Sequence, residues 1–376
     1  MSDTGVRIFH NDGTHFDFNE RSTVCYVPGI GSYPGFVESD YNVFEHTIKT
    51  SLRVPEGYDW WLWQTYNVNQ CWGYWLGHVS PIITRPTGPV ISSAFLDNNR
   101  FINVKWRYSP GLDDNGETVR PMWQIPDTLY GGVVWPVSQP REYGFQIFGV
   151  DNLAGIFDTS LVSYLLWKGE VDIHDGWSPA SIKPAFSMNS VLCFLYTTDP
   201  YAVISIEGNN RYRVWYKGWK YNGAIRAKIC IFGNGQPLSP VSDYGIEVFN
   251  PATGKLVYNS GRDVLIRPKL VPMSAGGVMS GNNISYPPIT VPGISRPMYA
   301  PTNISSGIGA GVTHDERGND VSIFYLWVTS NGRSLYLQPS GHRHHYYERA
   351  LAYDHPRLDH TPSPVMVIDA EDYFVF

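Results

Sequence analysis

The chain of 376 residues has few charged residues and no long hydrophobic run. Charged residues make up 16% of it, below the roughly 25% of an average soluble domain. Lys and Arg form no run and the formal net charge is −6, so we expect no nucleic-acid partner. No stretch is long enough for a membrane span, and the N-terminus lacks a basic segment followed by an apolar one. We therefore expect a protein that is made in the cytoplasm without a cleaved export signal and that does not span a membrane.

Cysteine is also scarce, and the four cysteines stand far apart without any Cys-x-x-Cys pair. This spacing is typical neither of a zinc site nor of a dense disulfide framework, so we expect buried free thiols. The sequence has no Gly-x-Ser-x-Gly, no Walker loop and no dinucleotide fingerprint. It therefore predicts no catalytic residue and no cofactor. The cysteines are Cys25, Cys71, Cys193 and Cys230.

Aromatic residues, glycine and proline are abundant instead. Aromatics make up 15% of the chain, and there are 36 Gly and 28 Pro. This composition favours short strands joined by frequent turns over long helices. The sequence predicts an all-β fold with little helix, the best helical candidates being 161–167 and 346–353. The chain is longer than a domain with a single hydrophobic core usually is, so several domains are expected.

One pattern occurs three times, at 5–17, 143–158 and 244–259. Each copy reads glycine, apolar, polar, apolar, phenylalanine, then a turn and an apolar or aromatic stretch that contains Asp or Asn. Alternation with period two followed by turn residues predicts a β-hairpin. The three copies align on Gly5, Gly144 and Gly245. We expect the rings at the fifth position to be buried, namely Phe9, Phe148 and Phe249.

The repeats predict three tandem, divergent, antiparallel β-sandwich-like modules, because strand–turn–strand patterns also follow the first two hairpins. Module 1 spans 1–130, module 2 spans 141–235 and module 3 spans 241–376. Linkers are predicted at 131–140 and 233–240, where glycine and proline gather. The Gly-, Pro- and Ser-rich stretch 273–311 is predicted to be a long loop without regular structure.

The module openings resemble the small β-modules of minor tail or tail-tip (baseplate-associated) proteins of long-tailed bacteriophages. The residues that carry this resemblance are 143–160, 219–232 and 244–260, with 5–17 as a looser match. The resemblance implies a virion component at the distal tail that binds other tail proteins or the host surface. It implies no chemistry. The sequence departs from the family pattern in having three copies and a late histidine-rich segment.

An aromatic-rich segment at 58–75 is a candidate sugar-stacking or protein-binding surface. Neighbouring residues of a strand point to opposite sides, so these tryptophans cannot all face one core. Packing against a neighbouring module is the interpretation we favour over a ligand surface. The candidate binding residues here are Trp60, Trp61, Trp63, Trp72 and Trp75.

A histidine cluster at 342–345 is the sharpest local feature, and His355 and His360 follow it. With nearby carboxylates these rings could coordinate a transition metal, but their scattered spacing favours an exposed loop that contacts a partner. We therefore predict no metal site. The candidate binding residues are His342, His344, His345 and Tyr346.

Acidic residues suggest a third and weakest interpretation, glycoside hydrolysis by paired carboxylates. The candidates are Asp113, Asp114 and Glu117, or Asp172 with Asp175, and turns explain both sets. The leading hypothesis is a non-enzymatic structural component of a phage tail tip or baseplate. The alternative is a receptor- or carbohydrate-binding protein of the distal tail. The expected partners are other tail proteins, with a host receptor or glycan as a second class, and we expect multiple copies in a symmetric particle.

Overall fold

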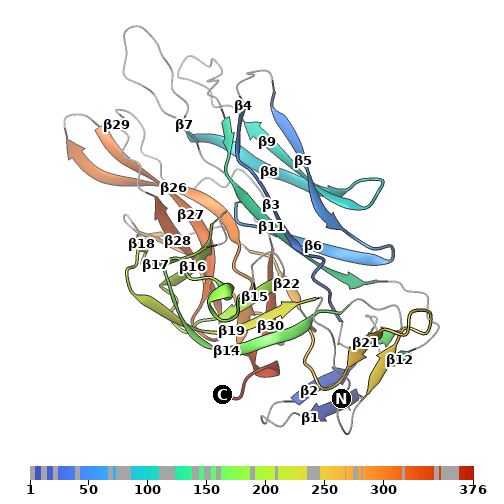
Figure 1. Cartoon of the computed structure of the whole chain (residues 1–376). Coiled ribbons are helices and arrows are strands. Elements are labelled where there is room, and N and C mark those ends of the chain that lie inside the picture. The colour runs from blue at the N-terminus through green and yellow to red at the C-terminus, as the bar shows by residue number, and fades with distance from the viewer. Residues whose placement is uncertain are drawn as a thin grey trace.

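The computed structural model of the chain is built almost entirely of β-strands (Figure 1). Among the described residues, helix is limited to the three-residue 3-10 turns η1 (Pro179–Ser181) and η3 (Ala370–Asp372). No helix in this part of the chain is long and apolar enough to cross a membrane. The prediction of an all-β fold with little helix is confirmed. The structure describes residues 5–9, 15–19, 24–38, 43–66, 71–72, 86–109, 123–137, 144–147, 154–157, 162–186, 191–207, 211–234, 246–266, 268–273, 278–280, 283–315, 318–342, 347–348 and 364–376.

The strands fall into three sets, which we call repeats 1, 2 and 3. Repeat 1 contains β1 (Gly5–Phe9), β2 (His15–Asn19), β3 (Ile30–Tyr33), β4 (Phe36–Glu38), β5 (Glu45–Arg53), β6 (Tyr58–Gln64), β7 (Cys71–Trp72), β8 (Pro86–Leu96), β9 (Phe101–Ser109), β10 (Trp123–Ile125) and β11 (Thr128–Pro136). Repeat 2 contains β12 (Gly144–Ile147), β13 (Ala154–Phe157), β14 (Tyr164–His174), β15 (Val191–Tyr196), β16 (Ala202–Ile206), β17 (Tyr212–Tyr216), β18 (Trp219–Lys220) and β19 (Ala224–Gly233). Repeat 3 contains β20 (Glu247–Phe249), β21 (Leu256–Asn259), β22 (Lys269–Val271), β23 (Val278–Ser280), β24 (Asn283–Ser285), β25 (Pro297–Tyr299), β26 (Asn303–Asp315), β27 (Gly318–Ser330), β28 (Leu335–His342), β29 (Tyr347–Glu348) and β30 (Val365–Asp369).

Each repeat opens with a two-stranded antiparallel hairpin, as the sequence pattern predicts. The hairpins are β1–β2, β12–β13 and β20–β21. In the third, the side chain of Asn250 accepts hydrogen bonds from the backbone N–H groups of Ala252 and Thr253, and Gly254 has a φ of +66°. This is the asparagine and glycine chemistry that closes a tight turn.

The three repeats share one strand order. Their central sheets run β3–β11–β6, β14–β19–β15 and β22–β30–β25. In each, the first strand after the hairpin is an edge strand, and the last strand of the repeat returns to lie in the middle. Three occurrences of this antiparallel arrangement in one chain establish that the repeats are related modules.

A second layer covers each central sheet and is built around a later hairpin: β8–β9, β16–β17 or β26–β27. In repeat 1 the two layers enclose their own core. Its members are Tyr33, Leu52, Val54, Tyr58, Ile102, Val104, Trp106, Ile125, Tyr130 and Val134. Trp106 is fully buried, and its indole N–H donates to the Tyr33 hydroxyl (3.1 Å). Apolar side chains from two facing sheets thus form a sandwich.

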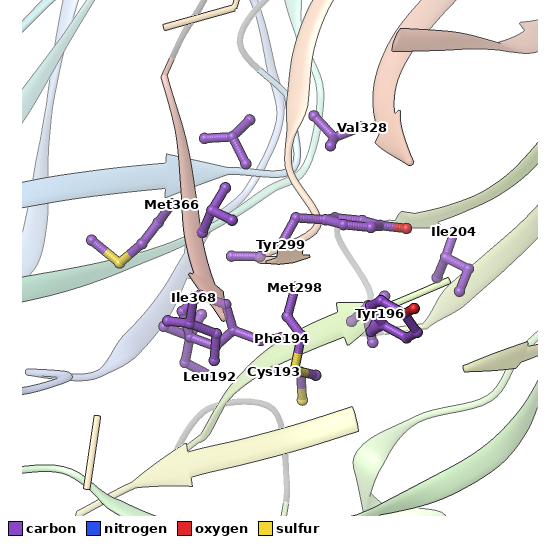
Figure 2. Close-up of a cluster of buried hydrophobic side chains, with 14 of the residues drawn as sticks. Leu192, Cys193, Phe194, Tyr196, Ile204, Met298, Tyr299, Val328, Met366 and Ile368 are labelled. Carbon is purple, nitrogen blue, oxygen red and sulfur yellow. The ribbon is translucent and has the colours of Figure 1, made fainter. Parts of the chain in front are cut away.

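Repeats 2 and 3 are joined more closely. Their central sheets form one six-stranded sheet, because β15 pairs with β25 through Leu195 and Tyr299. Figure 2 shows the apolar side chains at this junction, where Phe194 and Met298 come from different repeats and are both fully buried. The sheet takes three strands from the range 141–235 and three from 241–376. The module boundaries themselves stay predictions.

Three sequence expectations are wrong. The linker expected at 131–140 is wrong over 131–136, which belong to the buried strand β11. The loop expected at 273–311 contains β23, β24, β25 and the first part of β26, and Met298, Tyr299 and Ala300 are fully buried. The helix expected at 161–167 is strand β14 from Tyr164 onward. The second helical candidate, 346–353, includes β29 and otherwise lies outside the described residues.

Candidate functional site

The three opening hairpins lead into short segments that meet at one point. The segments are centred on Cys25, Ser163 and Leu265. Each of these residues lies between the opening hairpin of its repeat and the first strand of the central sheet, which is β3, β14 or β22. The three segments therefore occupy equivalent places in the three repeats.

Backbone hydrogen bonds link the three segments into a closed ring. The N–H of Cys25 donates to the carbonyl of Leu265 (3.0 Å), the N–H of Leu265 donates to the carbonyl of Ser163 (2.9 Å), and the N–H of Ser163 donates to the carbonyl of Cys25 (3.0 Å). Every member donates to one neighbour and accepts from the other. This cyclic pattern gives the three segments a local pseudo-threefold symmetry, and we call these residues the axial ring.

The axial ring is closed to solvent on both sides. The residues that precede its members, Val24, Val162 and Val264, pack together with Tyr258 and Val248 of the third hairpin. The side chains of Cys25 and Leu265 belong to the large core that all three repeats share. Neighbouring residues of an extended segment point to opposite sides, which explains why one residue of each pair faces the hairpin side and the next faces the shared core.

One contact departs from the threefold pattern. The backbone N–H of Val27 donates to the hydroxyl of Ser163 (2.9 Å), and that hydroxyl also contacts the side-chain oxygen of Asn234 (2.5 Å). The side-chain N–H of Asn234 in turn donates a hydrogen bond to the carbonyl of Val27. At the position where the other repeats have cysteine and leucine, repeat 2 therefore uses a serine to satisfy a buried backbone donor.

The third hairpin has an inner and an outer face. Val248 and Tyr258 are paired across the hairpin and pack against the centre, whereas Phe249 is 49% exposed and Ile246 is also exposed. The expectation that the fifth-position ring is buried is therefore wrong for Phe249. The side chains of Phe9 and Phe148 lie outside the described residues. Figure 1 shows β1, β2, β12 and β21 gathered at one end of the molecule, beside the N-terminus.

The aromatic segment at 58–75 does not form one surface. Trp61 and Trp63 are buried in the shared core, and the indole N–H of Trp61 donates to the carbonyl of Pro364 in repeat 3 (3.1 Å). Trp60 packs against the separate core of repeat 1 instead. The strand β6 thus has a core on each side, which agrees with packing between modules. Trp72 lies in β7, and its side chain and all of Trp75 lie outside the described residues.

The histidine cluster falls mostly outside the described residues. His342 is the last residue of β28, and His344, His345 and Tyr346 follow in the part that the structure does not describe. Within the described residues, no group of three or more His, Cys, Asp or Glu side chains could hold a metal ion.

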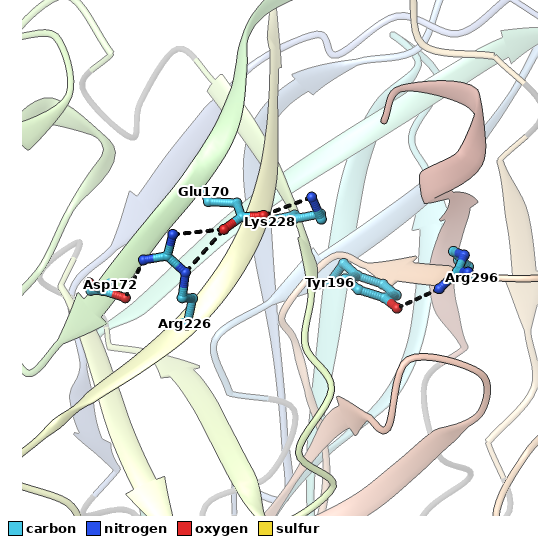
Figure 3. A network of polar contacts seen from close by, with 6 residues as sticks. All are labelled: Glu170, Asp172, Tyr196, Arg226, Lys228 and Arg296. Atoms are coloured by element: carbon cyan, nitrogen blue, oxygen red, sulfur yellow. Dashed lines mark hydrogen bonds and ion pairs between the residues drawn. The ribbon is translucent and has the colours of Figure 1, made fainter. Parts of the chain in front are cut away.

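The carboxylates considered for glycoside hydrolysis form ion pairs where the structure describes them. Asp172 lies in β14, not in a turn, and pairs with Arg226 (3.2 Å), which also binds Glu170 (2.8 Å) in the network of Figure 3. Asp175 pairs with Arg213 (2.8 Å) and Lys220 (3.1 Å). Hydrogen bonds from Lys228 and Arg226 lower the pKa of Glu170. Asp113, Asp114 and Glu117 lie outside the described residues.

Sequence reasoning missed an aromatic patch at the edge of repeat 2, formed by the exposed Tyr201, Trp219 and Tyr221 and the half-buried Tyr216. Trp219 is 56% exposed, and the rings of Tyr216 and Tyr221 lie 5.7 Å apart. Lys217 lies over the Tyr201 ring at 5.3 Å. The turn between β17 and β18 has positive φ at Lys217 (+51°) and Gly218 (+82°), as in a type I′ hairpin. The signal in the sequence was this Lys-Gly turn between aromatic residues.

The patch also offers polar groups. The carboxylate of Asp199 accepts a hydrogen bond from the backbone N–H of Tyr201 (2.9 Å) and raises the pKa of the Tyr216 hydroxyl through its charge. Together with the ammonium group of Lys217, these atoms flank the exposed rings. Flat rings flanked by hydrogen-bonding groups match the faces and hydroxyls of a sugar.

Buried thiols and phenols give the fold a predictable response to alkaline pH. Burial raises the pKa of Cys193 to about 12, and it raises the pKa of Cys25, Cys230, Tyr212 and Tyr373 as well. In the unfolded chain these groups have their usual pKa values, about 8.5 for cysteine and about 10 for tyrosine. The folded state therefore binds more protons in this range, and its stability falls as pH rises.

We therefore expect the free energy of unfolding to decrease steadily above about pH 8.5 and to fall more steeply above about pH 10. Urea denaturation at pH 7, 9 and 10.5, in the presence of a reductant, measures it. A denaturation midpoint that stays constant up to pH 10.5 would show that these groups are accessible in the native protein.

Comparison with known proteins places most of the chain in one family. A family model described as a family of unknown function (DUF6453) matches residues 85–308, which is more than half of the chain. The matched range begins in repeat 1, includes all of repeat 2 and ends in repeat 3. No curated protein and no solved structure matches the chain.

Proposed function

Because the chain belongs to the family of unknown function DUF6453, whose description assigns no activity, we propose from its architecture that it is a non-enzymatic structural component of a phage tail tip or baseplate. In this role it joins or decorates other virion proteins. It is made in the host cytoplasm and ends in the virion, in multiple copies within a symmetric particle.

The observation that carries the proposal is the closed axial ring at Cys25, Ser163 and Leu265. It joins the openings of three related modules at one buried centre. Such a joint suits a connector between other subunits, because it holds several modules together within one chain. The resemblance of the module openings at 143–160 and 244–260 to minor tail proteins supports the same role.

The test is to locate the chain in particles of the phage whose genome encodes it. Purified particles are analysed by quantitative mass spectrometry and by immunogold labelling with an antibody against the chain. We expect the chain in the particles and the gold at the tail end distal to the head. A chain found only in the soluble fraction of the lysate would contradict the proposal.

The aromatic patch of repeat 2 favours carbohydrate binding as a second candidate function. Sugar rings stack on exposed aromatic faces, and Asp199 and Lys217 supply hydrogen-bonding groups beside them. We expect the purified chain to bind bacterial surface glycans on an array and Trp219→Ala to weaken this binding at least tenfold. Phe44→Ala, at an exposed aromatic residue of repeat 1, is the control. Equal binding by both variants, or none by the wild type, would remove this candidate.

A further inference from the structure

We propose that the aromatic patch of repeat 2 binds an acidic polysaccharide whose sugars carry carboxylates, and that the ammonium group of Lys217 selects this ligand by pairing with one of them. The inference rests on carbohydrate binding, the second candidate function, because it names the class of sugar that the same patch takes. The structural role in the particle does not depend on it.

The backbone at Lys217 is the first observation. Among the described residues, Arg100 and Lys217 are the only ones other than glycine with a positive φ, +63° and +51°. This left-handed conformation is unfavourable for most residues that have a side chain. Arg100 uses its side chain to stabilise the fold, since its guanidinium group donates hydrogen bonds to the carbonyls of Val54 and Pro55. The ammonium group of Lys217 forms no hydrogen bond or ion pair with any described residue, so the strained position carries a side chain that is available to a ligand.

Two aromatic rings hold this ammonium group at the patch. It lies 5.3 Å from the centre of the Tyr201 ring and 5.7 Å from the centre of the Tyr216 ring. Both distances are in the range of cation–π attraction. Lys217 is exposed, so the rings position its positive charge where a ligand can reach it.

The carboxylates in this part of repeat 2 have other partners. Asp199 accepts a hydrogen bond from the backbone N–H of Tyr201 (2.9 Å). Asp175 pairs with Lys220, the next lysine along the hairpin (3.1 Å). Within the part of the chain that the structure describes, Lys217 thus carries a positive charge without a carboxylate partner. An acidic ligand supplies that partner.

An exposed ring lies beside this charge. Tyr216 and Trp219 are paired across β17 and β18, on either side of the turn that contains Lys217. Paired residues place their side chains on the same face of a hairpin, and Trp219 is 56% exposed. A sugar that stacks on Trp219 therefore lies next to the turn. In a uronic acid the carboxylate is attached to the sugar ring itself, so one sugar can both stack on Trp219 and form a charge-assisted hydrogen bond with Lys217.

The test uses the purified full chain on an array of neutral and uronic-acid-containing bacterial capsular polysaccharides. Each acidic polysaccharide is also printed after chemical reduction of its carboxyl groups to alcohols, which keeps the linkages and removes the charge. We expect the native acidic forms to bind at least about tenfold more tightly than the reduced forms, the effect of one hydrogen bond between charged groups. The chain has a formal net charge of −6, so general attraction of polyanions does not explain such a preference.

Lys217→Asn separates a role in binding from a role in folding. It places asparagine before Gly218, a pair that a type I′ turn favours, so its denaturation midpoint should be no lower than that of the wild type. We expect it to bind the native and reduced forms with equal affinity. Lys183→Gln is the matched control, because Lys183 is also exposed and lies over an aromatic ring, 5.6 Å from the centre of the Phe186 ring, but is outside the patch. It should keep the preference of the wild type.

The outcomes separate the inference from the candidate function on which it rests. If the wild type binds no polysaccharide in any form, carbohydrate binding and the inference are both overturned. If the wild type binds reduced or neutral forms as tightly as native acidic forms, or if Lys217→Asn keeps the preference, the inference is overturned and carbohydrate binding stands. The comparison of native and reduced forms needs no variant, so it decides the matter even if a substitution impairs folding.

Discussion

Replacing Leu265 by alanine is expected to lower the free energy of unfolding by about 2–5 kcal/mol, the cost of a large-to-small change in a well-packed core. Leu265 is 0% exposed and lies where the cores of the three repeats meet. Side chains around it come from different sheets that hold one another in place, so they cannot move inward freely to fill the cavity. The loss should therefore lie in the upper part of this range.

The matched control is Leu270→Ala, five residues further along the same repeat. Leu270 lies in β22 but is 39% exposed, so its truncation should change the free energy of unfolding by less than about 0.5 kcal/mol. Urea denaturation followed by tryptophan fluorescence measures both variants. Similar losses for the two leucines would mean that Leu265 is not packed in a shared centre.

Replacing Ser163 by alanine is expected to destabilise the protein by about 1–3 kcal/mol, although it removes only one oxygen atom. The change leaves the N–H of Val27 without its acceptor and removes the contact to the Asn234 side chain. Val27 is almost fully buried, so water cannot easily replace the lost partner. An unsatisfied buried donor carries its full desolvation cost.

Ser181→Ala is the control for this prediction. The hydroxyl of Ser181 also donates a hydrogen bond, to the carbonyl of Ser178 (2.6 Å), but this residue is exposed and water can take its place. We expect its effect on the denaturation midpoint to be within experimental error. A loss in Ser163→Ala no larger than in Ser181→Ala would show that the hydroxyl of Ser163 has no structural role at the centre.

The hairpins and the tryptophan segment were predictable because they depend on local periodicity. Alternation with period two predicts which residues of β6 point to opposite sides, and the structure places Trp60 and Trp61 in different cores. The same rule explains the error at Phe249. Its neighbour Val248 faces the centre, so Phe249 points outward.

The misassigned linker at 131–140 shows where local signals fail. The pair Gly131-Gly132 resembles a turn, but both residues lie in a buried strand. A Cβ atom on Gly131 would lie 2.6 Å from the indole nitrogen of Trp63, so glycine serves close packing here and not chain reversal. The rings that require this space are far away in the sequence.

The strand β26 was missed for a related reason. Its glycine- and serine-rich sequence has low strand propensity, but it pairs with β27 along most of its length, and pairing outweighs local preference. The axial ring could not be predicted at all. Its members are a cysteine, a serine and a leucine, and they interact through backbone atoms between residues more than one hundred positions apart.

Amide hydrogen exchange at Cys25, Ser163 and Leu265 tests the central claim most directly. These N–H groups are the three donors of the axial ring, so each is protected as long as the two repeats that its hydrogen bond joins stay together. We predict that all three exchange at one common slow rate, with a protection free energy equal to the global free energy of unfolding. Each repeat takes part in two of the three bonds, so much faster exchange of two of these N–H groups than of the third would show that one repeat opens independently, and it would contradict a closed pseudo-threefold centre.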